Sequence, residues 1–180
     1  MGPGTDLDVR AVIMSGRSIV GEGGYVVSRA PGAPVHEAAV GVLDLVGGTI
    51  ATNLGSLVAA IALTLGLAAL LRHEGVGRVG LSTAVVVAIP WFLVAATSTI
   101  DFLWALALWV GAALVLRRAP TVAGAVGAGV LAGLAVGSRS STALLVLGLA
   151  LAEALDRRDP DASDRDPPSP SPVARAAVLL

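Results

Sequence analysis

The sequence predicts an all-α fold: a multi-pass membrane bundle of about five short hydrophobic helices, preceded by an extracytoplasmic amino-terminal loop with interfacial helices. Three observations predict this fold class. Hydrophobic residues make up 55% of the 180 residues and charged residues only 14%, whereas a soluble domain has about 25% charged residues. The mean hydropathy is +0.83. Charged residues are also scarce from 47 to 152, so this stretch divides into long uncharged blocks, which indicate bilayer spans.

The composition excludes several functional classes. The hydropathy excludes a soluble enzyme, and the absence of cysteine excludes disulfide frameworks, thiolate metal sites and thiol nucleophiles. The two histidines, His36 and His73, are too far apart in sequence to give a metal-ligand spacing, so we expect no metal and no cofactor. The formal net charge is -1, so no basic field predicts nucleic acid as a partner. The expected partner is the lipid bilayer.

Residues 1–46 are mostly polar and glycine-rich, and they are predicted to form an extracytoplasmic loop. They do not begin with the apolar segment that is typical of a secretory signal. Two helices are expected in this loop, over 7–20 and 36–46, with an extended, turn-rich segment between them. In the second helix apolar residues recur at helical spacing. We therefore expect this helix to lie at the membrane interface with Glu37 and Asp44 on its wet side.

Five apolar blocks within 47–155 are each predicted to be a membrane helix. They cover approximately residues 50–71, 81–97, 102–116, 122–137 and 142–155. The first block has 22 residues without a charge, and at about 1.5 Å per residue it would measure about 33 Å, a full span. The later blocks are shorter, at 14 to 17 residues, so we expect them to pair through re-entrant or buried turns. Pro90 is expected to kink the second block within its span.

A bundle in which neighbouring blocks merge into single long helices is rejected. One helix from 81 to 116 would measure about 54 Å, well beyond a hydrocarbon core of about 30 Å. The polar clusters at 97–101 and 138–142 then fall where turns are needed.

The distribution of arginine predicts the orientation of the bundle in the cell membrane. Arginines close to span ends on one side of the bundle are Arg72, Arg78, Arg117, Arg118, Arg157 and Arg158. The positive-inside rule places this side in the cytoplasm. The loop over 1–46, Asp101 and Arg139 are therefore expected on the extracytoplasmic face.

The carboxy-terminal residues form two further segments. Residues 156–172 are acidic and proline-rich, which predicts a disordered cytoplasmic loop. Residues 173–180 are apolar apart from Arg175, as at the start of a further span. A long extracytoplasmic loop without a preceding span, and a final span that stops short, both indicate a piece of a longer polytopic protein.

Ionisable residues on the expected extracytoplasmic face are the candidates for chemistry. Asp6 and Asp8 stand at the start of a predicted helix, where a carboxylate serves either as a general base or as a helix cap. Asp101, close to membrane depth, is either functional or placed at the positive end of the next helix dipole. Arg139 stands among hydroxyl residues before a helix, where a guanidinium either binds a phosphate or reaches lipid head groups.

Four segments carry a recognisable series of motifs. An acidic residue opens the outer loop, and residues 25–37, YVVSRAPGAPVHE, match the pattern aromatic-x-x-[SP]-R-x-x-G-x-P-x-x-E. Residues 98–101, STID, are a small-residue stretch ending in aspartate, and residues 133–139, GLAVGSR, match Gly-Leu-Ala-x-x-[ST]-[KR]. In this order the series resembles the polytopic GT-C glycosyltransferases, specifically the protein mannosyltransferase and aminoarabinose transferase-like group. Members of that group are longer than this chain.

The resemblance implies an integral membrane glycosyltransferase that moves a sugar from a polyprenyl-phosphate-linked donor to an acceptor on the extracytoplasmic face. The motifs leave the sugar and the acceptor open. Asp8, or its neighbour Asp6, would be the catalytic base in a single inverting displacement, and Arg139 would hold the donor phosphate. The other substrate-binding residues that the resemblance implies are Arg29, Glu37 and Asp101.

Other classes stay open beside this one. The chain is alternatively a polytopic transporter or a non-catalytic membrane module, or it is an inactive fragment of a longer protein. Transporters place ionisable groups near the membrane midplane at broken helices. Here the charges cluster at one face, which favours chemistry at the interface.

Overall fold

The computed structural model describes residues 7–119 and 121–156. Over these ranges the chain is helical and has no strand, so the predicted all-α class is confirmed. The predictions for Asp6 and for the tail over 157–180 lie outside the described residues. The elements are α1 (Leu7–Arg17), the π-helical turn η1 (Ser18–Glu22), α2 (Pro34–His73), α3 (Val79–Val87), α4 (Pro90–Thr97), α5 (Phe102–Arg118), α6 (Val122–Ser138), the 3-10 turn η2 (Ser140–Thr142) and α7 (Ala143–Asp156).

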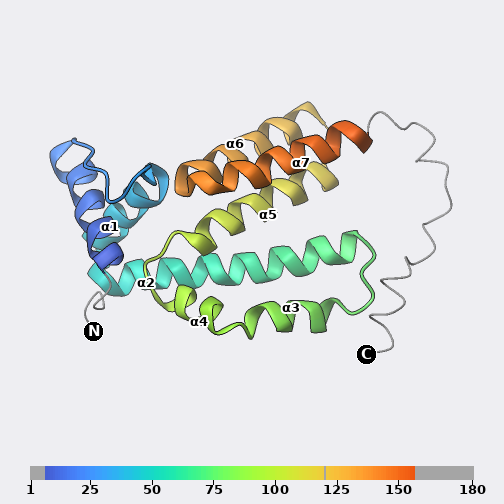
Figure 1. Ribbon diagram of the computed structural model, residues 1–180, viewed down its shortest axis with the longest axis horizontal. Helices are drawn as coiled ribbons and strands as arrows, with labels where there is room; N and C mark the ends of the chain where they lie inside the picture. The colour runs from blue at the N-terminus through green and yellow to red at the C-terminus, as the bar shows by residue number, and fades with distance from the viewer. Residues whose placement is uncertain (1–6, 120, 157–180) are drawn as a thin grey trace.

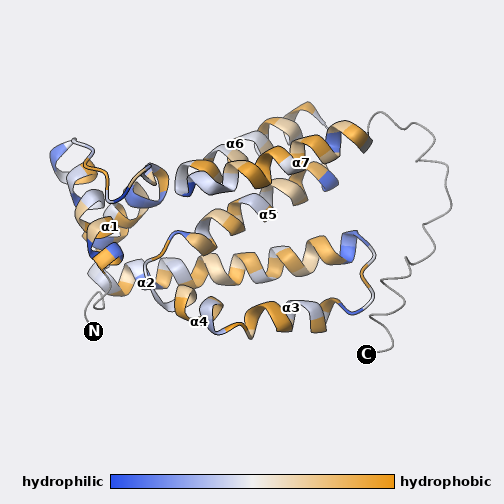
Figure 2. Ribbon diagram, viewed as in Figure 1, coloured by the Kyte–Doolittle hydropathy of each residue, from blue (hydrophilic) through white to orange (hydrophobic). Residues whose placement is uncertain are grey.

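The helices are arranged around α2. Figure 1 shows α2 running along the molecule, with α3 and α4 on one side, α5, α6 and α7 on the other, and α1 across one end. Hydrophilic residues gather at the α1 end and at the opposite ends of the long helices, whereas the helix bodies are hydrophobic (Figure 2). The molecule therefore has two polar ends joined by an apolar body.

The long helix α2 consists of two helices that meet at a kink. Gly47 (φ -153°, ψ 19°) and Gly48 (φ 59°, ψ -150°) both have non-helical backbone angles. The positive φ of Gly48 is a conformation that residues with a Cβ rarely adopt, so glycine is required there. The kink separates the 34–46 part, which packs against α1, from the apolar 49–73 part.

The block over 81–97, predicted as one span with a kink at Pro90, is two separate helices. α3 and α4 are bent by 68° at the break between them. Pro90 is the first residue of α4, and Ile89 before it is extended (φ -63°, ψ 123°). Proline has no backbone N–H and disfavours helical angles in the preceding residue, so the helix ends there and restarts.

Among the described residues, one helix is long and apolar enough to cross a membrane, and this helix is α2. The bent pair α3 and α4 makes a second candidate if it counts as one broken span, and α6 and Ser140–Leu155 are apolar but shorter. The structure thus supports one clear membrane-capable helix, or two with the bent pair, where the sequence predicted about five spans.

Two hydrophobic clusters join α1, α2, α4 and α5. The larger cluster joins α2, α4 and α5 and consists of Ala60, Leu63, Phe92, Ala95, Ala96, Leu103 and Val110. The smaller cluster joins α1 to the first part of α2 and consists of Val9, Val12, Ile13 and Val40. Beside the smaller cluster, Gly16 of α1 lies against the backbone of Gly41 in α2. This close crossing fixes α1 on the helix that also carries the apolar span.

The predicted wet side of the 36–46 helix is wrong. Glu37 is 0% exposed and Asp44 is buried, because α1 packs over this side of α2. Each carboxylate has a polar partner on α1: Ser15 Oγ donates to Glu37 Oε2 at 3.0 Å, and Arg17 Nε donates to Asp44 Oδ2 at 2.6 Å. The hydrogen bond and the charge of Asp44 raise the pKa of Arg17 above its ordinary value.

Candidate functional site

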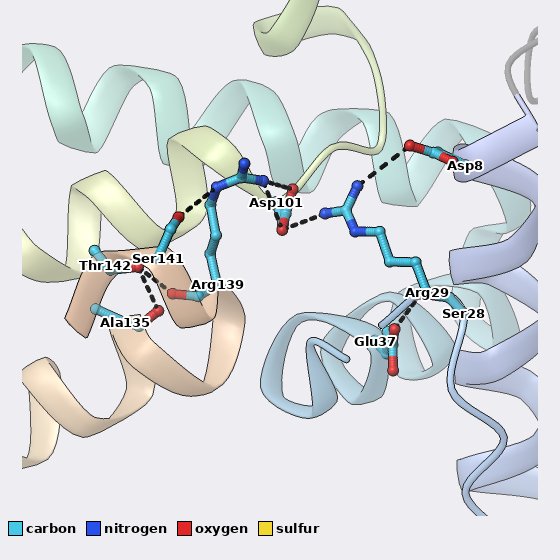
Figure 3. Close-up of polar contacts among 9 residues, drawn as sticks. All are labelled: Asp8, Ser28, Arg29, Glu37, Asp101, Ala135, Arg139, Ser141 and Thr142. Atoms are coloured by element: carbon cyan, nitrogen blue, oxygen red, sulfur yellow. Dashed lines mark hydrogen bonds and ion pairs between the residues drawn. The ribbon is translucent and has the colours of Figure 1, made fainter. Parts of the chain in front are cut away.

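Four charged side chains form a continuous chain of ion pairs at the α1 end of the molecule. They come from four separate segments: Asp8 from α1, Arg29 from the loop before α2, Asp101 from the turn before α5, and Arg139 from the turn after α6 (Figure 3). Arg29 Nη1 lies 3.3 Å from Asp8 Oδ2, and Arg29 Nη2 lies 2.5 Å from Asp101 Oδ2. Arg139 Nη1 lies 3.2 Å from Asp101 Oδ1. We call this set the ionic chain.

Asp101 is the centre of the ionic chain. It is 1% exposed, and an ionised carboxylate buried to this degree is costly unless charged donors compensate it. Both oxygens have such donors. Oδ1 accepts from Arg139 Nη1, and Oδ2 accepts from Arg29 Nη2 and, at 3.3 Å, also from Arg139 Nη1. Asp101 precedes α5, but its side chain makes no capping hydrogen bond to that helix. Pairing with two guanidiniums therefore explains why an aspartate is buried at position 101, whereas helix capping does not.

Arg29 links the buried centre to the surface. Its hydrogen bond to Asp101 is the largest cause that raises the pKa of the guanidinium above its ordinary value, and the charge of Asp8 adds to it. Arg29 is therefore cationic at every physiological pH. Its side chain is 31% exposed, and that of Asp8 is 65% exposed. The outer end of the ionic chain is thus open to ligands, whereas its centre is not.

The loop that carries Arg29 is held by a buried carboxylate. Ser28 Oγ donates to Glu37 Oε1, and Ser15 Oγ of α1 donates to Glu37 Oε2 at 3.0 Å. Tyr25, at the start of the same loop, has a raised pKa because of burial and because its hydroxyl hydrogen-bonds to Glu37. Glu37 therefore lies behind the loop and fixes its position, and it is not among the residues that line the cavity at the ionic chain.

Arg139 is oriented by three contacts. Its Nε donates to Ser141 Oγ at 3.0 Å, its Nη1 pairs with Asp101, and its guanidinium carbon lies 3.6 Å from the centre of the Phe102 ring. A guanidinium over an aromatic face is attracted to the π electrons of the ring. Phe102 in turn makes an edge contact with Trp91, with ring centres 6.0 Å apart. These contacts hold the Arg139 head group at the cavity.

The ionic chain lines a cavity of about 500 Å³. The polar and aromatic side chains in its wall are those of Asp8, Arg29, Trp91, Thr99, Asp101, Phe102, Arg139, Ser140 and Ser141. Four of the residues singled out by the sequence thus meet in one place: Asp8, Arg29, Asp101 and Arg139. Trp91 and Phe102 carry no chemical motif in the sequence, because their roles depend on which side chains lie beside them after folding.

A second cavity, of about 710 Å³, is almost wholly apolar. Its wall comes from both parts of α2, from α5 and from α6, and includes Val35, Leu43, Leu54, Trp104, Leu134 and Ser138. Ser138 lines this apolar cavity and the next residue, Arg139, lines the charged one. The end of α6 and the turn after it therefore contribute to the walls of both cavities.

One arginine also pairs with two glutamates at the far polar end of the molecule. Arg117, at the end of α5, lies 3.2 Å from Glu74 after α2 and 3.3 Å from Glu153 in α7. Because α5 starts beside Asp101 and ends beside Arg117, the two charged regions are about 25 Å apart along a helix of this length. Over residues 7–119 and 121–156, no group of three or more histidine or acidic residues could hold a metal ion.

Comparisons with known proteins do not assign the chain to a family. No family model matches it, and no curated protein and no solved structure shows a significant match.

Proposed function

We propose that this chain is an integral membrane glycosyltransferase of the GT-C type, which moves a sugar from a polyprenyl-phosphate-linked donor to an acceptor on the extracytoplasmic face. The observation that carries the proposal is the ionic chain, which brings two carboxylates and two guanidiniums from distant segments into one cavity of about 500 Å³. The ordered motifs of the sequence support the same function. No metal or other cofactor is part of the proposal.

The exposed surface of α2 supports membrane insertion. Leu54, Val58, Ile61 and Leu65 follow one another at helical spacing and are 52% to 66% exposed. Only 22% of the most apolar stretch of α2 is buried, so this helix is unlike the core helix of a soluble protein. A continuous exposed apolar stripe is stable against lipid and unfavourable in water. We propose that α2 spans the bilayer, and that α3 to α7 complete a multi-pass bundle beside it.

The orientation follows from the two polar ends. The end with Arg72, Arg78, Arg117 and Arg118 would face the cytoplasm by the positive-inside rule. The ionic chain, at the other end of α5, would then lie at the extracytoplasmic surface. A lipid-linked donor in the outer leaflet would place its phosphate at Arg139 and its polyprenyl chain toward the apolar cavity that Ser138 lines.

The chemistry needs one base and one cation at the phosphate. Asp8 takes the proton of the acceptor hydroxyl or amine while the acceptor atom forms a bond to the anomeric carbon of the sugar. The bond between that carbon and the phosphate oxygen breaks in the same step, and the electron pair leaves with the polyprenyl phosphate. Arg139 stabilises the leaving phosphate by charge-assisted hydrogen bonds. The phosphate leaves without protonation, so a single carboxylate suffices.

One observation favours a second candidate function. The broken pair α3 and α4 ends two residues before the cavity residue Thr99, and transporters build their binding sites from broken helices. A carrier for a phosphorylated lipid would use the same two arginines but would break no bond. Sugar release from the donor therefore separates the two functions.

The test is the substitution Asp8→Asn in the full chain. Membranes of expressing cells are supplied with a polyprenyl-phosphate hexose that is radiolabelled in the sugar, and loss of label from the lipid is followed. We expect a loss of activity of about 10²-fold to 10⁴-fold, because the amide cannot take up the proton. Asp8 is 65% exposed, so the variant is expected to fold.

The matched control is Glu22→Gln. Glu22 is an exposed acid of the same amino-terminal region, and it does not line the charged cavity. This variant should keep the activity of the unaltered chain. Full activity in Asp8→Asn would reject the role of Asp8, and no sugar release by the unaltered chain would reject the transferase.

A further inference from the structure

The two ion pairs of Arg29 differ greatly in burial and in length. The pair with Asp101 is short, at 2.5 Å, and the Asp101 side chain is 2% exposed. The pair with Asp8 is long, at 3.3 Å, and the Asp8 side chain is 65% exposed. Exposed ion pairs contribute little, whereas breaking a buried pair leaves an uncompensated charge. An anion that enters the cavity would therefore compete with Asp8 and not with Asp101.

The charges of the ionic chain lead to the same conclusion. Without a ligand, the charges of its two aspartates and two arginines sum to zero. A sugar phosphodiester adds one negative charge, and it prefers the paired N–H donors of guanidinium groups. Arg29 and Arg139 are held on either side of Asp101 and both line the cavity, so their outward N–H groups can share one phosphate. The bound phosphate would also repel the nearby carboxylate of Asp8.

We propose that the donor phosphate displaces Asp8 from Arg29, so that the base is turned toward the acceptor only when a donor is bound. In the unloaded site Arg29 Nη1 holds the Asp8 carboxylate. With donor present, Arg29 and Arg139 hold the phosphate, Asp101 keeps both guanidiniums in place, and Asp8 leaves Arg29. This inference rests on the proposed transferase and concerns the control of its base. No bond is made or broken in the exchange, and the acceptor is activated only beside a loaded donor.

The competition between Asp8 and a ligand phosphate for Arg29 can be measured by ligand binding alone, without any chemical step. The full chain is placed in nanodiscs of phosphatidylcholine, and the Kd is measured for farnesyl phosphate and for inorganic phosphate. Because Asp8→Asn removes the competing charge but keeps the shape, we expect farnesyl phosphate to bind about threefold to fivefold tighter. Arg29→Gln should weaken binding, and Asp8→Asn should have no effect in the Arg29→Gln background. Such a double-mutant cycle isolates the pairwise exchange.

Each outcome supports or overturns the proposal. Glu22→Gln controls for general loss of negative charge and should leave the Kd unchanged. If Asp8→Asn lowers the Kd of farnesyl phosphate by the same factor in the unaltered chain and in the Arg29→Gln background, Asp8 only repels the ligand. That result overturns the exchange. An unchanged Kd in Asp8→Asn, together with lost binding in Arg139→Gln, overturns the exchange and leaves the proposed phosphate site intact. No binding of farnesyl phosphate by the unaltered chain overturns both.

The two probes separate a lipid head group from free phosphate. If the apolar cavity beside Ser138 holds the chain of the donor, farnesyl phosphate should bind more tightly than inorganic phosphate. The thermal unfolding midpoint of each variant is measured in the same nanodiscs. The unfolding midpoint of Asp8→Asn should equal that of the unaltered chain. If Asp8→Asn binds farnesyl phosphate more tightly but unfolds at a lower temperature, the result counts against the exchange.

Discussion

Glu37 illustrates how a single buried side chain sets the position of a surface loop. Its two oxygens accept hydrogen bonds from Ser15 of α1 and from Ser28 of the loop, next to Arg29. Because each hydroxyl comes from a different segment, the carboxylate ties the loop to α1 and α2 together. The place of Arg29 in the ionic chain depends on this contact.

Tyr25 gives a spectroscopic test of the same contact. Burial and the hydrogen bond to Glu37 raise the pKa of its phenol above the ordinary value of 10.0. The chain has one tyrosine, so the alkaline absorbance change at 295 nm reports Tyr25 alone. We expect Glu37→Gln to lower this pKa toward 10.0 without reaching it, because burial persists. An unchanged titration in Glu37→Gln would contradict the contact.

The raised pKa also predicts how Tyr25 affects stability at high pH. The folded chain keeps the phenolic proton at a pH where the unfolded chain begins to lose it. The contribution of Tyr25 to stability is therefore complete below about pH 10 and is lost as the pH rises through the folded-state pKa. Urea unfolding at a series of alkaline pH values checks this, and Tyr25→Phe should remove this part of the pH dependence.

At the residue scale, the sequence identified charged residues but not their partners. Asp8, Arg29, Asp101 and Arg139 were all singled out, since ionisable residues at an expected membrane face are rare and costly. Their pairing joins positions 38 to 72 residues apart around Asp101, and no local pattern encodes such contacts. The expected exposure of Glu37 was wrong for a related reason. α1 covers this side of α2 by a tertiary contact, which the helical spacing of 36–46 does not encode.

Among the elements, the crossing of α1 over α2 depends on two glycines. A Cβ at Gly16 would lie 2.5 Å from the carbonyl oxygen of Glu37 and 2.7 Å from the nitrogen of Gly41, closer than real Cβ atoms approach. Both atoms belong to the backbone, so neither can move without shifting a helix. The small cluster around Val12 and Val40 would then separate.

We expect Gly16→Ala to destabilise the fold by about 1 to 3 kcal/mol, the usual cost of overpacking. The matched control is Gly129→Ala on α6, where a Cβ meets nothing within 4 Å. There the higher helix propensity of alanine predicts a gain of up to about 1 kcal/mol. Thermal unfolding of both variants in detergent measures the difference. Equal stability of the two variants would rule out the close crossing.

Breaks between elements were readable from the sequence, but the resulting angles were not. Pro90 marks a helix break through its missing N–H, and Gly47 and Gly48 mark another through backbone freedom. No local pattern encodes the 68° bend between α3 and α4, two helices that both contact α2. Propensity gives the place of a break, whereas tertiary packing gives its direction.

For the whole molecule, the proposed orientation can be tested with single cysteines, because the chain has none of its own. Ser140 lies at the ionic-chain end, and Gly77 lies in the turn between α2 and α3; both are exposed. In intact cells an impermeant maleimide should label Ser140→Cys, whereas Gly77→Cys should label only after permeabilisation. Labelling of both positions from the same side would reject the proposed topology.

The number of membrane crossings was the least predictable property of the molecule. Apolar composition identified the 49–73 part of α2, because its length matches a bilayer. α6 has 17 residues and would measure about 25 Å as a straight helix. Whether such a helix spans depends on its tilt and its neighbours, which composition does not specify.

The charge balance of the ionic chain has a consequence for how a ligand arrives. Two positive and two negative side chains within one cavity produce a field that fades over a short distance, and the net charge of the whole chain is only -1. Long-range attraction, which speeds encounters through water and weakens with added salt, is therefore small. A lipid phosphate would have to meet the two guanidiniums by lateral diffusion within its own leaflet. Its rate of capture should then follow the fluidity of the bilayer far more than the ionic strength of the medium.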